Sequence, residues 1–167
     1  MDTTSYHAAL PYPPIQAGGK NSRYARIMLD NLGGIVSEMS AVNSYFYNYL
    51  ITSENPEVSR TFHQISIVEM HHMEIFAILA LQLGADPRLW TRKQNKMVYW
   101  SPSYNTYPKP IRELLSNSLH QEQAAIVKYQ HQAHIINNEN IVENLKRIIM
   151  DEQLHVTRFK SLLAHLK

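Results

Sequence analysis

Two pairs of residues with metal-binding chemistry occur along the chain at the same spacing. Glu69 is followed three residues later by His72, and Glu152 is followed three residues later by His155. Residues i and i+3 lie on one face of a helix, so each pair can present a carboxylate and an imidazole to the same ion. A single pair of this kind is weak evidence, because glutamate and histidine are common enough to match by chance.

Two further glutamates, Glu38 and Glu122, occupy positions in apolar stripes with alternating steps of three and four residues. Such stripes form the seam of a helical bundle, where a lone carboxylate costs several kcal/mol of desolvation. A Glu from each of two helices and Glu-x-x-His from each of the other two is the ligand set of a carboxylate-bridged dimetal bundle. Two divalent cations would also cancel the charge of four carboxylates. The predicted metal ligands are Glu38, Glu69, His72, Glu122, Glu152 and His155.

The two halves of the chain repeat this pattern. The segment EMSAVNSY aligns with EQAAIVKY, and each places a tyrosine, Tyr45 or Tyr129, seven residues after its glutamate. The segment EMHHMEIF likewise aligns with EQLHVTRF. A pseudo-twofold site follows, in which the two tyrosines either contact ligand carboxylates or only pack in the core. Asp151, next to a predicted ligand, is expected to orient a ligating imidazole across the bundle, as outer carboxylates often do.

Proline and glycine positions divide the chain into elements. Residues 1–20 are rich in both and predict an extended arm, followed by a dimetal bundle over residues 21–167. The predicted helices span residues 21–51, 56–83, 110–136 and 140–166, with a crossover at 84–109. Because that crossover is long enough to travel the length of the bundle, the second and third helices should be parallel. The predicted fold class is all-α, a four-helix bundle with one long crossover.

Composition excludes several classes of function. The 167 residues contain no cysteine, which excludes disulfides, thiolate catalysis and cysteine-ligated iron or zinc within the chain. A formal charge of +2 is too small to suggest a nucleic-acid surface. The N-terminus lacks the pattern of a secretory signal, and no apolar run approaches the roughly 18 residues of a membrane span. We therefore expect a cytoplasmic protein that binds neither nucleic acid nor membrane.

With these residues in place, the sequence resembles the ferritin-like dimetal carboxylate superfamily, and is most similar to the diiron domain of rubrerythrins and to the manganese catalases. The resemblance covers about residues 22–166, and the segment IIMDEQLH is a familiar form of the fourth helix. It implies a ferritin-like four-helix bundle that holds two iron or manganese ions through the six residues named above. Two features depart from the rubrerythrin pattern: the cysteines of a rubredoxin-type centre are missing, and Ala125 stands where a second third-helix glutamate is common.

The resemblance implies a non-haem dimetal oxidoreductase of peroxidase or catalase type, acting on hydrogen peroxide or dioxygen and most simply scavenging peroxide. A peroxidase of this kind would need an external electron-donor protein, and we expect a homodimer. Two alternatives remain open: ferritin-like iron oxidation and storage, and a structural bundle that its metals stabilise without turnover. The alternative to a metal site is that these glutamates and histidines form buried ion pairs and bind no metal.

Other polar and aromatic residues are expected to have ordinary roles. His71 and Glu74 lie on different helical faces from His72 and should be exposed or at a subunit interface. By the same argument, four more histidines should be exposed or at a subunit interface: His63, His120, His131 and His134. The aromatic crossover is expected to cover the bundle or a partner subunit rather than to form a cofactor platform.

Overall fold

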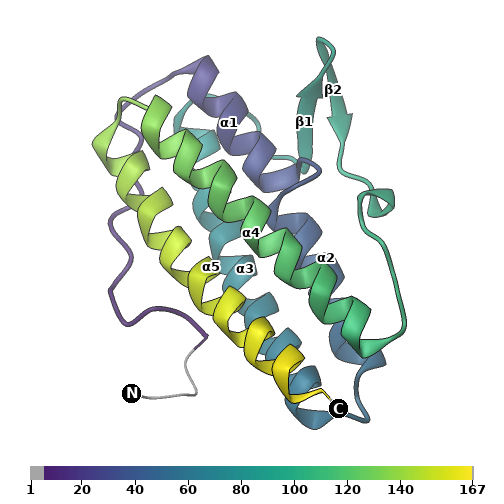
Figure 1. The fold of residues 1–167 in the computed structure, drawn as a ribbon. Coiled ribbons are helices and arrows are strands. Elements are labelled where there is room, and N and C mark those ends of the chain that lie inside the picture. Colours follow the sequence, from purple (N-terminus) through teal and green to yellow (C-terminus); the bar gives the residue numbers. More distant parts are fainter. Residues whose placement is uncertain (1–5, 167) are drawn as a thin grey trace.

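Four rods of helix lie side by side in the structure, a computed structural model that describes residues 6–166 (Figure 1). The first rod is divided into α1 (Ser22–Gly33) and α2 (Glu38–Ile51), which follow one another along one edge of the bundle. The other rods are α3 (Pro56–Gln82), α4 (Ile111–Ile135) and α5 (Glu139–His165). The connection between α3 and α4 returns along the length of the bundle, so these two helices run in the same direction (Figure 1).

The single helix predicted over residues 21–51 is wrong, because the chain bends between α1 and α2. The Gly34 N–H donates to the Asp30 carbonyl at 2.9 Å and ends α1, while the Ser37 side chain caps the start of α2. A Cβ at Gly34 would lie 2.5 Å from the Asp30 carbonyl oxygen, so this bend requires glycine. As a result Glu38 is the first residue of α2 rather than mid-helix, and Ile35 is 55% exposed rather than in the core.

The other helices begin at residues whose local chemistry favours a start. Asn55 caps α3 by accepting the Val58 N–H at 3.3 Å, and Pro56 occupies the first helical position, where its missing N–H is harmless. Asn138 caps α5 in the same way through the Ile141 N–H at 3.0 Å. Each of these caps follows a short turn. The turns join α2 to α3 and α4 to α5, and the helices of each pair pack against each other.

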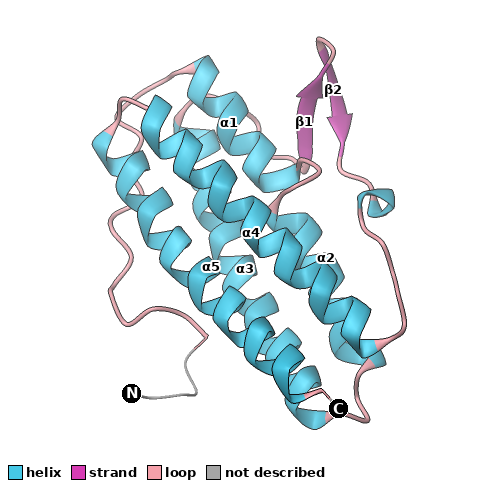
Figure 2. Cartoon of the chain, viewed as in Figure 1, coloured by secondary structure: helices cyan, strands magenta, loops and turns pink. Residues whose placement is uncertain are grey.

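The crossover contains a β-hairpin that its sequence did not predict. Strands β1 (Trp90–Lys93) and β2 (Lys96–Tyr99) pair antiparallel and stand beside α1 (Figure 2). Gln94 and Asn95 form the turn with φ of 47° and 65°, the conformation that two-residue hairpin turns require. The crossover is tied to the bundle where the Trp100 ring N–H donates to Ser40 Oγ at 3.0 Å.

Two apolar clusters fill the bundle on either side of a polar layer. One cluster includes Met28, Leu32, Phe76, Leu79, Ile141, Leu145 and Ile148. The other includes Phe62, Ile65, Leu114, Leu115, Phe159 and Leu162. Burial of these side chains supplies the main driving force for folding, and it offsets the cost of the polar layer between them.

By length and composition alone, α3 could cross a membrane. Half of the apolar window that passes this test is buried inside the bundle, and core helices commonly pass it. Its buried face also carries Glu69 and His72. We therefore interpret α3 as a helix that packs in the bundle core.

Residues 6–20, the described part of the N-terminal arm, form no helix or strand and run beside α5 (Figure 1). The Asn144 side chain donates to the Pro14 carbonyl at 3.1 Å, and the Asn138 side chain donates to the Ala17 carbonyl at 3.0 Å. The Gln82 side chain accepts the Ala17 N–H at 2.8 Å. Side chains from α3 and α5 thus hold the arm against the bundle.

Candidate metal centre

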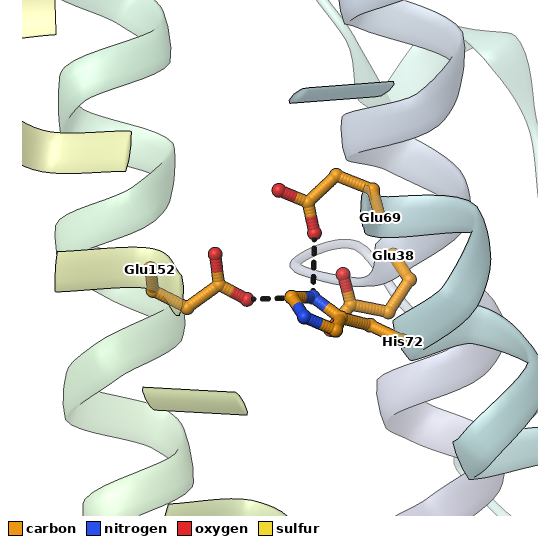
Figure 3. Close-up of side chains that lie close together, drawn as sticks. All are labelled: Glu38, Glu69, His72 and Glu152. Carbon is orange, nitrogen blue, oxygen red and sulfur yellow. Dashed lines mark hydrogen bonds and ion pairs between the residues drawn. The ribbon is translucent and has the colours of Figure 1, made fainter. Parts of the chain in front are cut away.

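The six predicted ligand residues converge in the polar layer. Glu38 comes from α2 and Glu122 from α4, while α3 and α5 each contribute one glutamate and one histidine. All six residues are at most 2% exposed. Figure 3 shows four of them, Glu38, Glu69, His72 and Glu152, pointing toward one another from three helices.

Two overlapping groups of four residues have ligand atoms that lie within 4.8 Å of one another. The first group is Glu38, Glu69, His72 and Glu152, and the second is Glu69, Glu122, Glu152 and His155. Glu69 and Glu152 belong to both groups, so each could contribute to holding both of two ions. The site therefore has the donor set of a dimetal carboxylate centre: hard oxygen atoms and imidazole nitrogens suited to iron or manganese.

The contacts around the imidazoles support cation binding rather than a closed ion-pair network. His155 Nδ1 lies 2.9 Å from Glu69 Oε1, 3.0 Å from Glu152 Oε2 and 3.6 Å from Glu122 Oε1. One nitrogen carries at most one proton, so it cannot satisfy three carboxylate oxygens. Among the described residues, Glu69 Oε1 and Glu152 Oε1 are buried and accept no hydrogen bond of good geometry. Unpaired buried carboxylate oxygens are costly, and metal ions would satisfy them.

Burial and mutual repulsion shift the ionisation of the carboxyls on α2 and α4. Burial raises the pKa of Glu38 well above 4.5, and the charges of Glu69 and Glu152 raise it further. Glu122 has its pKa raised by the same causes in the same order. These two carboxyls therefore favour the protonated form unless a cation is bound nearby.

The pKa values of His72, His155 and Glu69 are shifted so that each of these groups favours its charged form. Burial alone would lower the pKa of His72 and of His155, but neighbouring carboxylates outweigh it and raise both pKa values well above 6.5. Burial alone would raise the pKa of Glu69, but His155 and His72 hold it below its usual range. A metal ion binds neutral imidazole, so metal binding must displace these protons.

Tyr45 and Tyr129 each contact a carboxylate of the opposite half of the repeat. The Tyr45 hydroxyl donates to Glu122 Oε1 at 2.6 Å, and the Tyr129 hydroxyl donates to Glu38 Oε1 in a short hydrogen bond. Burial, followed by the charge of the neighbouring glutamate, raises the pKa of both tyrosines well above 10. Both hydroxyls therefore stay protonated and act as hydrogen-bond donors to the cluster.

Asp151 lies behind His72, on the side away from the carboxylate cluster. Its Oδ2 atom is 3.0 Å from His72 Nε2, so α5 supports an imidazole of α3 across the bundle. Burial would raise the pKa of Asp151, but hydrogen bonds from His72, Arg147 and Tyr12 hold it below its usual range. A carboxylate in this position fixes the ring orientation and increases the basicity of the nitrogen that faces the site.

The sequence did not predict three groups that lie around the two ligand histidines. Arg147 Nη1 lies 2.6 Å from Asp151 Oδ1, the Tyr12 hydroxyl lies 2.5 Å from Asp151 Oδ2, and the Tyr6 carbonyl accepts from His155 Nε2 at 2.9 Å. The i, i+4 spacing of Arg147 and Asp151 was an available signal for the ion pair. The arm has no periodicity, so nothing in the sequence pointed to the two tyrosines.

The remaining candidate residues lie apart from the cluster. His71 and Glu74 form a pair at 3.5 Å between side chains that are 43% and 65% exposed. Four further histidines that were considered as candidates are also exposed: His63, His120, His131 and His134.

A cavity of about 200 Å³ opens onto the cluster between α2 and α4. Its inner wall includes Glu38, Glu122 and Glu152, and its outer wall includes Ile35 and Ala125. Because the bend before α2 exposes Ile35, the bend forms one rim of the cavity. A small molecule that enters here would reach the carboxylates directly.

The fold and the site together define a ferritin-like four-helix bundle with a dimetal carboxylate-like site. Residues 32–163 match the family model described as Rubrerythrin, and the chain belongs to this family. The predicted fold class is therefore confirmed, as is the superfamily that the motifs indicated.

Individual relatives agree on the fold and differ in their described activity. A bacterioferritin from Desulfovibrio desulfuricans is 24% identical over 156 residues, which cover 90% of this chain and 82% of the relative. A manganese catalase structure from Anabaena superposes with a TM-score of 0.83 at 21% identity, covering 95% of this chain and 78% of the other. A dodecameric thioferritin from Bacteroides fragilis has a TM-score of 0.69 at 19% identity, with 88% of each chain covered.

Proposed function

We propose that the protein is a dimetal oxidoreductase that acts on hydrogen peroxide or dioxygen, and that it scavenges peroxide. The observation that carries this proposal is the pair of four-residue groups that share Glu69 and Glu152 beside a small cavity. We assign the six clustered residues as the ligands of two ions. When bound, iron or manganese ions would supply electron transfer and Lewis acidity at this site.

The chain's own residues would balance the charge of the bound ions and orient the carboxylates that hold them. The carboxylates from four helices neutralise two divalent cations, so the loaded site is uncharged when both imidazoles are neutral. The Tyr45 and Tyr129 hydroxyls hold Glu122 and Glu38 in place. These hydrogen bonds limit which carboxylate oxygens remain free to bind a cation.

The cavity supports a small substrate that forms hydrogen bonds. Its volume of about 200 Å³ suits a molecule of a few heavy atoms. Gln121 Oε1 belongs to a wall residue and, among the described residues, has no hydrogen-bond partner. It can therefore accept a hydrogen bond from peroxide, whereas Ala125 leaves space where a longer side chain would narrow the cavity.

Two reactions fit this arrangement and differ in their electron supply. Disproportionation converts two hydrogen peroxide molecules into one dioxygen and two waters, and needs no outside electrons. Reduction of one hydrogen peroxide to two waters needs two electrons and two protons. Because the chain has no cysteine to bind an iron centre, a separate donor protein would supply those electrons.

Dioxygen evolution from hydrogen peroxide without a reductant tests the proposal. Manganese-loaded and iron-loaded protein should be compared, together with Glu69→Gln, which removes a shared carboxylate charge, and exposed Glu74→Gln as the matched control. We expect turnover from wild type and Glu74→Gln, and a loss of at least about 100-fold in Glu69→Gln. If neither metal form consumes peroxide, with or without an electron donor, the proposal fails.

Iron oxidation and storage is the second candidate function, and the bacterioferritin relative favours it. Storage requires a hollow assembly of many subunits, whereas we propose a homodimer. Sedimentation should therefore give a mass near twice 19.4 kDa. A mass of ten or more subunits, together with rapid ferrous oxidation and retained iron, would favour storage instead.

A further inference from the structure

The N-terminal arm lies directly behind both proposed ligand histidines. The Tyr6 carbonyl accepts a hydrogen bond from His155 Nε2 at 2.9 Å. The Tyr12 hydroxyl lies 3.3 Å from His72 Nε2 and donates to Asp151 Oδ2 at 2.5 Å. The outer nitrogen of each imidazole therefore faces a group of the arm, whereas Nδ1 faces the carboxylates.

Arg147 joins the arm to Asp151. Its side chain is 2% exposed, and it donates through Nε to the Leu10 carbonyl at 2.6 Å and through Nη2 to the Ala8 carbonyl at 2.8 Å. Its guanidinium carbon also lies 4.0 Å from the centre of the Tyr12 ring. A buried guanidinium is costly unless its donors are paired, and the docked arm supplies two of the acceptors that pair the donors of Arg147.

Asp151 depends on the arm in the same way. Its Oδ1 atom accepts the Ala8 N–H at 2.6 Å, in addition to its contact with Arg147. The carboxylate that orients His72 is therefore itself oriented by the arm. The repeat provides no equivalent for His155, because Val68 stands before Glu69 where Asp151 stands before Glu152. The Tyr6 carbonyl takes that role in the second half.

We propose that the N-terminal arm is a positioning element of the metal centre: its docking fixes both histidines, so arm docking and metal binding strengthen each other. This inference rests on the proposed ligand set. Thermodynamic linkage makes the effect reciprocal, so the factor by which docking tightens metal binding equals the factor by which metal stabilises docking.

Hydrogen exchange of the full-length chain, with and without manganese, measures the metal's effect on the arm. The informative amides are those of Ala8 and Ala17, which donate to Asp151 and to Gln82. We expect bound manganese to slow their exchange by about tenfold, a typical coupling between sites. Unchanged exchange while two manganese ions bind per chain would overturn the inference and leave the metal centre intact. If wild type binds no metal, the proposed function fails as well.

Tyr12→Phe measures the reverse effect, because it removes the hydroxyl and keeps the ring against Arg147. Manganese binding should weaken by about tenfold, as for other losses of outer-shell contacts, and the manganese electron paramagnetic resonance spectrum should change. The matched control is Tyr24→Phe, which removes a hydroxyl that accepts the Asn137 N–H at 2.9 Å, away from the cluster. Wild-type affinity and spectrum in Tyr12→Phe, at equal metal-free melting temperature, would overturn the inference.

Gln82→Ala separates arm docking from local effects at the histidines. Gln82 holds the arm through Ala17 and Ile15, at 2.8 and 3.0 Å, and contacts no proposed ligand. Its loss should speed exchange in the arm and weaken manganese binding by about fivefold, whereas exposed Gln130→Ala should do neither. Faster arm exchange with unchanged manganese affinity would contradict the proposal.

Discussion

Tyr129 makes its only described hydrogen bond to Glu38, so its hydroxyl can be removed without disturbing another partner. Tyr129→Phe should lower the free energy of unfolding by about 1–3 kcal/mol, because it leaves a buried carboxyl without its donor. Urea unfolding of metal-free protein measures this change. The exposed Tyr99→Phe provides a control with little expected effect. An unfolding free energy equal to that of wild type would show that the hydroxyl does not stabilise Glu38.

The clustered ionisable groups also predict how stability depends on pH. Glu38, Glu122, His72 and His155 all have a folded-state pKa raised above the ordinary value. A group with a raised pKa stabilises the fold below its unfolded pKa, and this contribution is lost as pH rises through the folded pKa. The melting temperature of metal-free protein should therefore fall as pH rises above 6.5, the ordinary histidine value.

Metal-loaded protein should not show this fall, because the bound ions replace the protons. Calorimetric titration in buffers of different ionisation enthalpy should accordingly detect proton release on manganese binding, up to one proton from each of these four groups. A metal-free melting temperature that rises between pH 6.5 and higher values would contradict the assigned protonation states.

Several ligand residues could be identified from sequence because helical spacing decides which side chains share a face. Glu69 and His72 illustrate this, since they need only one helix and the i, i+3 rule. Tyr12 could not be found in this way, because the arm has no period and its contact to Asp151 spans 139 residues of chain. Groups positioned by irregular backbone are decided by tertiary contacts that no local pattern encodes.

At the scale of elements, the bend between α1 and α2 places Glu38 and opens the cavity. The apolar stripe continues through Ile35, which is why a single helix was predicted, whereas Gly33 and Gly34 were the signal for the break. Close backbone contacts at these two glycines explain why the helix breaks there. A Cβ at Gly33 would lie 2.9 Å from the backbone of Leu89 and Trp90, so the start of the hairpin packs where only glycine fits.

Gly33→Ala should therefore destabilise the protein by about 1–3 kcal/mol, the usual cost of overpacking against atoms that cannot move aside. Thermal unfolding measures the change, and hydrogen exchange of β1 should show a loosened hairpin. Ser22→Ala, at the first position of α1, is a suitable control because it changes no such contact. Wild-type stability in Gly33→Ala would mean that the hairpin shifts freely away from α1.

At the scale of the whole molecule, carboxylates clustered between two apolar clusters should make the bundle more stable with bound cations than without them. Binding to the folded state alone adds about 2.7 kcal/mol of stability per site when the free metal concentration is 100 times the dissociation constant. Chelation should therefore lower the melting temperature, and added manganese should restore it. Equal melting temperatures with and without metal would show that the carboxylate cluster needs no cation.

Four exposed apolar side chains on α2 and α3 are candidates for the interface of the proposed homodimer. Phe46 and Leu50 on α2 are 56% and 51% exposed, and Ile67 and Met70 on the neighbouring α3 are each 45% exposed. A contiguous patch of exposed apolar side chains often marks a subunit interface, and these residues are candidates for one. The mass measurement described above tests this expectation together with the storage alternative.

Anomalous diffraction from crystals loaded with manganese tests the central claim most directly. Two peaks per chain are expected, one among Glu38, Glu69, His72 and Glu152, and the other among Glu69, Glu122, Glu152 and His155. Both should disappear in Glu69→Gln crystals if the shared carboxylate bridges the ions. Loaded crystals with no anomalous peak inside the cluster would contradict the account.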